Sequence, residues 1–176
     1  MKIIRISVLF ILFAFSSATI INIPTIFSTI QSGLNAANPG DTVLVAPGIY
    51  SENIEWPATN SIKLIGGVLH DLEGDGILDL IVNQAETIID GQGSSSVIRF
   101  SQPLGGIIDT STVIRGFTIR NGQAQKGGGI YGDNSSPKLI EVTITDNQVS
   151  GTDLVYGGGL YFTSFSSPIM EDVNII

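Results

Sequence analysis

Alternating acidic residues in one short segment are the first feature of this sequence that could do chemistry. In HDLEGDGILDL, acids stand at positions 1, 3, 5 and 9 of a calcium-binding loop, a glycine stands at position 6, and position 7 would contribute its backbone carbonyl. Calcium takes six to eight oxygen ligands, and a single loop with this spacing could supply most of them. The segment predicts a calcium site formed by Asp71, Glu73, Asp75, Ile77 and Asp79.

The same loop departs from the calcium pattern at two positions. Val82 stands at position 12, where a bidentate acid is usual, and Glu73 replaces the usual Asp or Asn. We therefore expect weak calcium binding, and the alternative is a solvated acidic turn. No flanking helices are expected, because the loop interrupts the passage between two apolar strands, SIKLIGG and ETIIDGQG.

Three aromatic residues could contact a sugar. Tyr131 and Tyr161 occupy equivalent places in two copies of a repeat. If they point outward they form a two-step row for stacking sugar rings, and if they point inward they are ordinary core residues, which is the commoner fate of large aromatics. Trp56, which precedes Pro57 in an expected loop, is the third candidate.

A repeat defines the elements that must position these residues. GGGIYGDNSSPKLIEVTITDN begins at Gly127, and GGGLYFTSFSSPIMEDVNII begins at Gly157. Each copy has three glycines, an aliphatic residue and a tyrosine, then Ser-Pro and an alternating strand, and a related strand lies at Phe117. Repeats of this length stack because each is too small to bury its own apolar face. Glycine, threonine and β-branched residues disfavour helices, so the repeat predicts a parallel β-helix.

Within that fold, the repeat makes three local predictions. Val142, Ile144, Val173 and Ile175 should point inward in stacked strands. The NG and DN pairs that follow two of the strands should form turns with positive φ. The glycine triplets should form bends or places of close backbone approach.

The N-terminal part predicts a cover for the first coil. In FSTIQSGLNAANPGD, Ser28 and Gln31 have capping-box spacing, while Phe27, Ile30 and Leu34 lie at helical spacing on one face. NPG at 38–40 should end this helix. A short capping α-helix followed by the first coils is expected, because the open end of a β-helix must be protected.

The first eighteen residues, MKIIRISVLFILFAFSSA, have a basic start, an apolar run and a small-residue cleavage site. They predict a signal peptide at 1–18 and export to the cell surface, the periplasm or the medium, with a β-helix domain at 19–176. The apolar run is too short to span a bilayer, so no transmembrane segment is expected after its removal. The remaining six basic and sixteen acidic residues give a charge of −10, which disfavours nucleic acid as a partner. There is no cysteine.

The segment IQSGLNAANPGDTVLVAPGIYSENI resembles the N-terminal entry of pectin-lyase-like right-handed parallel β-helix proteins. The GGG-aliphatic-Tyr repeats resemble those of bacterial surface β-helix proteins, including the polymorphic outer membrane protein group. This resemblance implies a right-handed parallel β-helix. It also implies a scaffold that carries lyases, hydrolases, epimerases and adhesins, so it selects no reaction.

The enzyme alternative is a pectate-lyase-like, calcium-assisted enzyme, for which the resemblance implies a lysine or arginine base beside carboxylates. The arginines available are Arg99, Arg115 and Arg120, and an arginine is a poor base. A hydrolase would need two carboxylates across a cleft. The one histidine is His70, and the acids are scattered singly along the coils: Asp90, Asp109, Asp133, Glu141, Asp146 and Asp172.

With no catalytic constellation recognised, we favour a binding or structural role over the enzyme alternative. The expected partner is a polysaccharide or cell-surface glycan. The sequence ends within an apolar strand, EDVNII, and solenoids need capped ends. We expect further coils beyond it, or end-to-end self-association through the last coil.

Overall fold

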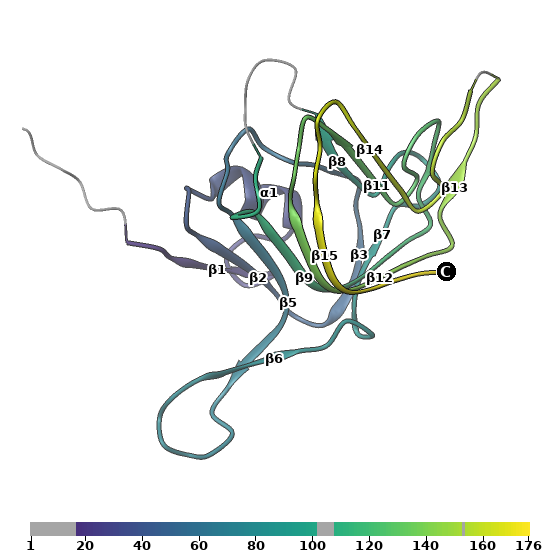
Figure 1. Ribbon diagram of the computed structural model, residues 1–176. Coiled ribbons are helices and arrows are strands. Elements are labelled where there is room, and N and C mark those ends of the chain that lie inside the picture. Colours follow the sequence, from purple (N-terminus) through teal and green to yellow (C-terminus); the bar gives the residue numbers. More distant parts are fainter. Residues whose placement is uncertain (1–16, 102–107, 153) are drawn as a thin grey trace, which may run out of the picture.

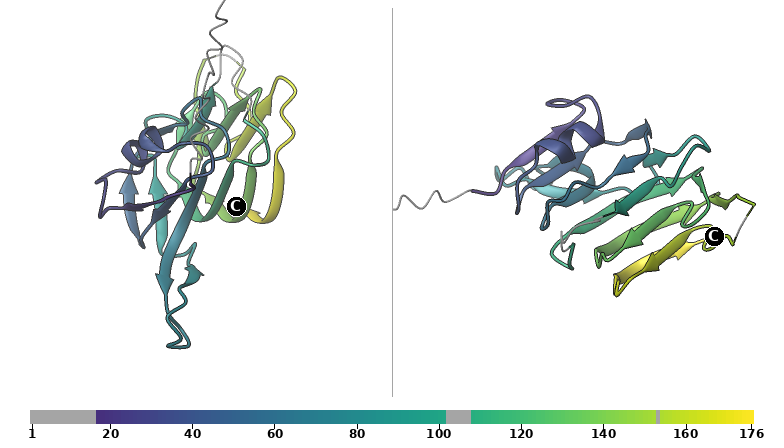
Figure 2. Two further views of the ribbon diagram at one scale, coloured as in Figure 1. Left: turned by 90° about the vertical axis from the view of Figure 1, so that its left-hand side faces the viewer. Right: turned by 90° about the horizontal axis from the view of Figure 1, so that it is seen from above.

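The strands of this protein wind around a common axis in stacked layers. The computed structural model describes residues 17–101, 108–152 and 154–176. Almost all strand pairs are parallel, and successive coils lie one above another along the axis, with the N-terminal coil at one end and the C-terminal coil at the other (Figures 1 and 2). The predicted parallel β-helix fold is therefore confirmed.

The largest sheet forms one side of the solenoid and runs its full length. Its strands follow one another in coil order, and every neighbouring pair along the main path is parallel. The main path is β1 (Ile20–Ile23), β2 (Thr42–Val45), β5 (Lys63–His70), β9 (Val113–Arg120), β12 (Lys138–Thr145) and β15 (Ile169–Ile175), with β3 (Gly48–Ser51) and β7 (Thr87–Asp90) joining at β9.

Two smaller sheets complete the coils. The first of them is parallel throughout and contains β4 (Ile54–Glu55), β8 (Ile98–Ser101), β11 (Ile130–Asp133) and β14 (Leu160–Thr163). The second is a short parallel pair, β10 (Gln123–Ala124) and β13 (Gln148–Val149). The coils that begin with β9 and β12 therefore cross the large sheet, one short strand and the four-stranded sheet in turn, whereas β3 and β7 take the middle place in the two coils before them.

Inward stacks of apolar residues form the core. Val142 pairs with Phe117 on one side and Val173 on the other, and Ile144 pairs with Ile175 on the far side. Phe117, Val142 and Ile144 are fully buried, as the alternating pattern predicts. Ile175 is 51% exposed although its side chain lies against Gly159, because no further described coil covers it. The predicted end-to-end association through this coil stays a prediction.

Residues in the left-handed region turn each coil at fixed corners. Asn121 and Asp146 have φ of 55° at the same corner of consecutive coils, which confirms the predicted turns. Glu141 and Asp172 repeat at another corner with φ of 51° and 52°. Asx residues tolerate this region because their short polar side chains bond locally. Glu141 is held there instead by its partner Arg115.

The glycine triplets are places of close backbone approach, as expected. A Cβ atom at Gly128 would lie 2.4 Å from the carbonyl oxygen of Gln148 and 2.6 Å from that of Gly158. A Cβ atom at Gly129 would lie 2.5 Å from the carbonyl oxygen of Gly159. Successive coils therefore pack backbone against backbone at this corner, where only glycine fits.

The N-terminal cover is a short helix, α1 (Ile30–Ala36), with Ile30 and Leu34 fully buried. The predicted cap at Ser28 is wrong by one position. Thr29 is the N-cap, and its side chain accepts a bond from the Ser32 amide at 3.1 Å. The carboxylate of Glu52 accepts hydrogen bonds from the free backbone N–H groups of Ile30 and Gln31 at 2.9 and 3.0 Å, so a residue from the first coil completes the cap. Sequence spacing cannot reveal a cap supplied by a distant residue.

The predicted signal peptide lies almost entirely outside the described residues, which begin at 17. Within the described part of the chain, no helix has the length and hydropathy needed to cross a membrane.

Candidate functional site

A straight row of outward side chains crosses the four-stranded sheet. The register aligns Arg99 of β8, Tyr131 of β11 and Tyr161 of β14, with Glu55 of β4 at the near end. Ile98 and Ile130, the neighbours in sequence, are fully buried, so alternation places the row on the outer face. Of the two orientations that the sequence left open for the tyrosines, the structure has the outward one.

The row is a continuous stack of charge and ring. The Arg99 guanidinium carbon lies 4.3 Å from the centroid of the Tyr131 ring. The Tyr131 and Tyr161 rings are stacked with centroids 6.2 Å apart and planes inclined by 21°. Partial burial raises the pKa of the Tyr131 hydroxyl, so this ring is uncharged at neutral pH.

Two further residues widen the row, and the sequence analysis missed both. Tyr156 stacks on Tyr161 with centroids 5.5 Å apart, and the Lys126 ammonium lies 5.6 Å from the centroids of both rings. Lys126 and Tyr156 pair across adjacent coils, each immediately before the glycine triplet of its repeat. The repeat alignment contained this signal, because both residues precede GGG.

A hollow of about 250 Å³ lies beside the row, lined by Arg99, Ala124, Gln125, Lys126 and Tyr131. Two cations therefore border one face of an aromatic ladder. Lys126 belongs to none of the four ion pairs found among residues 17–101, 108–152 and 154–176. Arg99 Nε lies 3.8 Å from a carboxylate oxygen of Glu55, so Lys126 is the cation beside this hollow whose charge no described carboxylate balances, and it could attract an anionic group.

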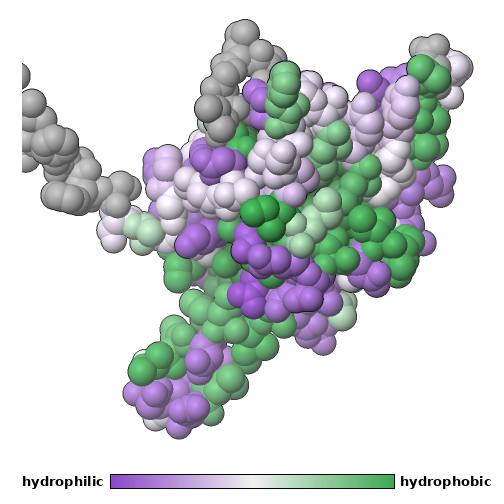
Figure 3. All heavy atoms as spheres, viewed as in Figure 1, coloured by the Kyte–Doolittle hydropathy of each residue, from purple (hydrophilic) through white to green (hydrophobic). Residues whose placement is uncertain are grey.

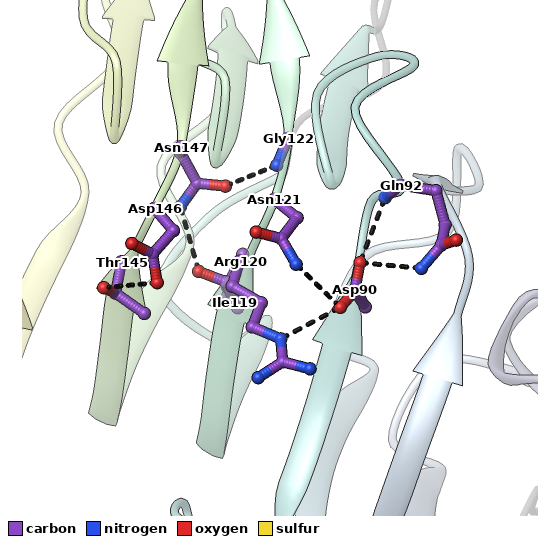
Figure 4. Close-up of polar contacts among 9 residues, drawn as sticks. All are labelled: Asp90, Gln92, Ile119, Arg120, Asn121, Gly122, Thr145, Asp146 and Asn147. Carbon is purple, nitrogen blue, oxygen red and sulfur yellow. Dashed lines mark hydrogen bonds and ion pairs between the residues drawn. The ribbon is translucent and has the colours of Figure 1, made fainter.

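A second, polar hollow lies where the strands β7, β9 and β12 end (Figure 4). It measures about 350 Å³ and is lined by Asp90, Gln92, Gly93, Asn121, Gly122, Gln123, Asp146 and Gln148. The scattered acids Asp90 and Asp146 are thus brought to one pocket by the stacking of coils. Their sequence separation gave no sign of this, because it exceeds one full coil.

Asp90 is 4% exposed and its two carboxylate oxygens are fully engaged. One accepts bonds from the Gln92 amide at 3.1 Å and the Gln92 side chain at 2.9 Å. The other accepts from Arg120 Nε at 2.9 Å and Asn121 Nδ2 at 2.8 Å (Figure 4). Burial alone would raise the pKa of Asp90, but these bonds outweigh it and hold the pKa below its ordinary value.

The acidic calcium-loop segment forms the tip of a projecting hairpin. β5 pairs antiparallel with β6 (Asp79–Val82), and the hairpin extends away from the solenoid, bearing both acidic and apolar surface (Figures 1 and 3). Asp71 accepts the N–H groups of Gly74, Asp75 and Gly76 at 2.7 to 3.1 Å, which lowers the pKa of Asp71. Asp75 accepts from Ile77 N at 2.8 Å.

In these contacts, backbone N–H groups of the loop donate to the carboxylates of Asp71 and Asp75. Among the described residues, no three His, Asp or Glu side chains gather into a group that could hold a metal ion. Calcium binding at Asp71, Glu73, Asp75, Ile77 and Asp79 stays a prediction, and it would require these carboxylates to turn toward one point.

Trp56 is not available to a ligand, so its assignment as a sugar contact is wrong. It is 2% exposed and packs on Phe100, with ring centroids 5.0 Å apart. Trp56 comes directly after β4, and alternation along this short segment turns it inward while Glu55 points out. The proline that follows had suggested an exposed loop.

Comparison with known proteins places the chain in a family. The family model described as "Protein of unknown function (DUF1565)" matches residues 22–169, which is most of the chain. The chain belongs to the DUF1565 family. No curated protein and no solved structure matches it.

The arginines considered as lyase bases are all engaged in this DUF1565 protein. Arg115 binds Glu141 through Nε at 2.8 Å and Nη2 at 3.3 Å, and this pairing raises the pKa of Arg115 further. Arg120 binds Asp90, and Arg99 lies on Tyr131. Because its pKa is lowered, Asp90 is ionised at neutral pH and has no proton to donate as a general acid.

Proposed function

We propose that this DUF1565 protein is an exported β-helix protein that binds a glycan along the outer face of its four-stranded sheet. The observation that carries the proposal is the outward stack of Tyr131 and Tyr161, with Arg99 and Lys126 beside it. Aromatic faces and fixed hydrogen-bonding groups are what sugar rings require.

The cations refine the class of ligand. Lys126 lies 5.6 Å from the centroids of the Tyr156 and Tyr161 rings and belongs to no ion pair among the described residues, so an anionic group bound beside it would gain a charge interaction. Arg99 contributes less, because Glu55 lies 3.8 Å from its Nε. A glycan bearing carboxylate or sulfate groups therefore fits better than a neutral one. The strongly acidic remainder of the surface would keep other polyanions away from the rest of the molecule.

The proposal includes export, which the basic start, apolar run and small-residue site of segment 1–18 support, and hence a location at the cell surface, in the periplasm or in the medium. A distant relationship to pectin-lyase-like β-helix proteins is part of the proposal and is supported by the fold and the entry segment. The proposed role is binding rather than cleavage.

The test is binding to a panel of glycans by titration calorimetry, with the tyrosines varied. Tyr131→Ala and Tyr161→Ala should each weaken binding by about threefold to tenfold, because a ring contact is lost. Tyr131→Phe should retain binding. Phe165→Ala is the matched control, since Phe165 is a fully exposed aromatic outside the row.

Two results would count against the proposal. If the tyrosine variants bind every glycan as well as the wild type does, the row is only structural. If incubation instead shortens the glycan, the polysaccharide-active alternative replaces simple binding.

A further inference from the structure

The polar hollow around Asn121 and Asp146 differs chemically from the aromatic row. Its lining is built by the coil repeat: Asn121 and Asp146 occupy the same left-handed corner in consecutive coils, and Gln123 pairs in register with Gln148. Side-chain amides are therefore stacked one above another along one wall. Among the residues that the structure describes, the lining of this hollow includes no aromatic or basic side chain.

The groups in this hollow differ in their freedom to bind. Asp90 is neutralised by Arg120 and has both oxygens occupied, so it shapes the wall without offering a free charge. Asp146 accepts only a 3.1 Å bond from its neighbour Thr145 within the described chain, and it is exposed. A ligand would therefore meet several amides and one free negative charge. This lining suits hydroxyl or amide groups and repels an anion.

The two hollows are consecutive along the chain. Gln123 lines the polar hollow, and its neighbours Ala124 and Gln125 line the hollow beside Tyr131. The run from Asn121 to Lys126 spans at most about 17 Å when extended. A short oligosaccharide laid along this run would touch both.

We propose that these two hollows form one groove that binds a glycan containing both anionic and uncharged sugars, with an uncharged sugar held in the polar hollow lined by Gln123, Asp146 and Gln148. This inference rests on the proposed glycan-binding function and adds a second subsite of opposite charge preference. The Lys126 end receives the anionic sugar, and the Asp146 end excludes it.

Three probes of matched length separate the possibilities in calorimetric titrations at fixed salt. They are hyaluronan oligosaccharides, which alternate a uronate with an uncharged amino sugar, oligogalacturonate, which is anionic throughout, and cello-oligosaccharides, which are neutral. Hyaluronan oligosaccharides should bind most tightly. Gln123→Ala and Gln148→Ala should each weaken that binding by about threefold to tenfold, since one or more hydrogen bonds are lost.

The decisive variant is Asp146→Asn. The fold should tolerate it, because Asn121 already occupies the equivalent corner with the same φ. Removing the charge should raise the affinity for oligogalacturonate by about threefold to fivefold, and so narrow the preference for hyaluronan oligosaccharides by a similar factor. Asp79→Asn on the projecting hairpin removes the same charge outside the groove and should change neither affinity.

The outcomes separate the two proposals. If oligogalacturonate binds as tightly as hyaluronan oligosaccharides and Asp146→Asn changes nothing, the uncharged subsite is overturned while Tyr131→Ala still reports on the row. If none of the three probes binds, both the subsite and the glycan-binding function are contradicted.

Discussion

At the scale of single residues, Asp90 organises the corner of the solenoid where the polar hollow lies. Its carboxylate ties together its own turn through Gln92 and the next coil through Arg120 and Asn121. A buried charge is tolerated only when it is paired and hydrogen-bonded, and Asp90 meets both conditions. Removing it would leave donors on two coils without their acceptor.

The lowered pKa of Asp90 predicts that the protein loses stability in acid. The folded pKa of Asp90 lies below the unfolded value of about 3.9, so its contribution is complete only above about pH 5 and disappears as pH falls through the folded pKa. Asp41, whose pKa is lowered by the amides of Asn38 and Thr19, adds to the same window. Urea unfolding between pH 2 and pH 7 measures the effect.

Asp90→Asn should reduce both the stability and this acid dependence. We expect a loss of about 2–4 kcal/mol at pH 7, since a buried, charge-paired acceptor is replaced. The same substitution at exposed Asp146 should change the free energy of unfolding by less than about 0.5 kcal/mol. An Asp90→Asn protein with an unchanged pH profile would show that the network contributes nothing.

At the scale of the elements, the inward stack of β12 determines cohesion between coils. Ile144→Asp would place an unpaired charge between Ile119 and Ile175, at a cost of several kcal/mol. Thr143→Asp, one residue away on the outer face, should be nearly neutral. Thermal melting followed by circular dichroism compares them, and equal melting temperatures would contradict the assigned faces.

The glycine triplets make a second prediction at this scale. Gly128→Ala should destabilise the protein by about 2 kcal/mol or more, because its methyl group would press on two carbonyl oxygens of neighbouring coils. Gly151→Ala is the control, since the nearest atom to its added Cβ is a flexible Gln125 side-chain carbon at 3.3 Å. If both variants melt alike, the close approach at Gly128 carries no constraint.

The hairpin makes a third prediction. Four carboxylates within nine residues repel one another, and calcium would relieve that repulsion. Calcium at about one hundred times its dissociation constant should stabilise the fold by roughly 2.7 kcal/mol, with weak affinity on the order of 10⁻⁴ to 10⁻³ M. Asp75→Ala should abolish the response, whereas Asp109→Ala should retain it. If millimolar calcium leaves the melting temperature unchanged, the segment is an acidic turn and the predicted calcium site is contradicted.

At the scale of the whole molecule, the sequence was sufficient for the fold because periodicity acts locally. Strand alternation, corner residues and glycine triplets recur in each coil, and each could be recognised without knowing what it contacts. The strand at Phe117 precedes the strand at Val142 by 25 residues, whereas the glycine triplets at Gly127 and Gly157 lie 30 residues apart. The two spacings differ because the second copy has five extra residues after β13.

The candidate site was harder to predict because it depends on which coil lies beside which. Tyr131 and Tyr161 could be paired from the repeat, but their outward orientation required the strand register. The pocket shared by Asp90 and Asp146 arises only from the stacking of coils. The burial of Trp56 could not be predicted, because Pro57 indicates a loop and a two-residue strand is too short for its alternation to be recognised.

The proposed glycan-binding groove is built from residues of several coils. Residues from three coils contribute Arg99, Tyr131 and Tyr161 in one line, so a ligand bound there would bridge coils and stiffen the solenoid. Glycan binding should therefore raise the melting temperature, and the rise should grow with the logarithm of ligand concentration once that concentration exceeds the dissociation constant.

The most direct test of the glycan-binding groove is a two-dimensional NMR titration of the protein with hyaluronan oligosaccharides. The account predicts saturable shift changes at Tyr131, Tyr161 and Lys126 and along the run 121–126, with the hairpin at 71–79 unaffected. Shift changes confined to other faces of the solenoid, or no change with any glycan, would contradict it.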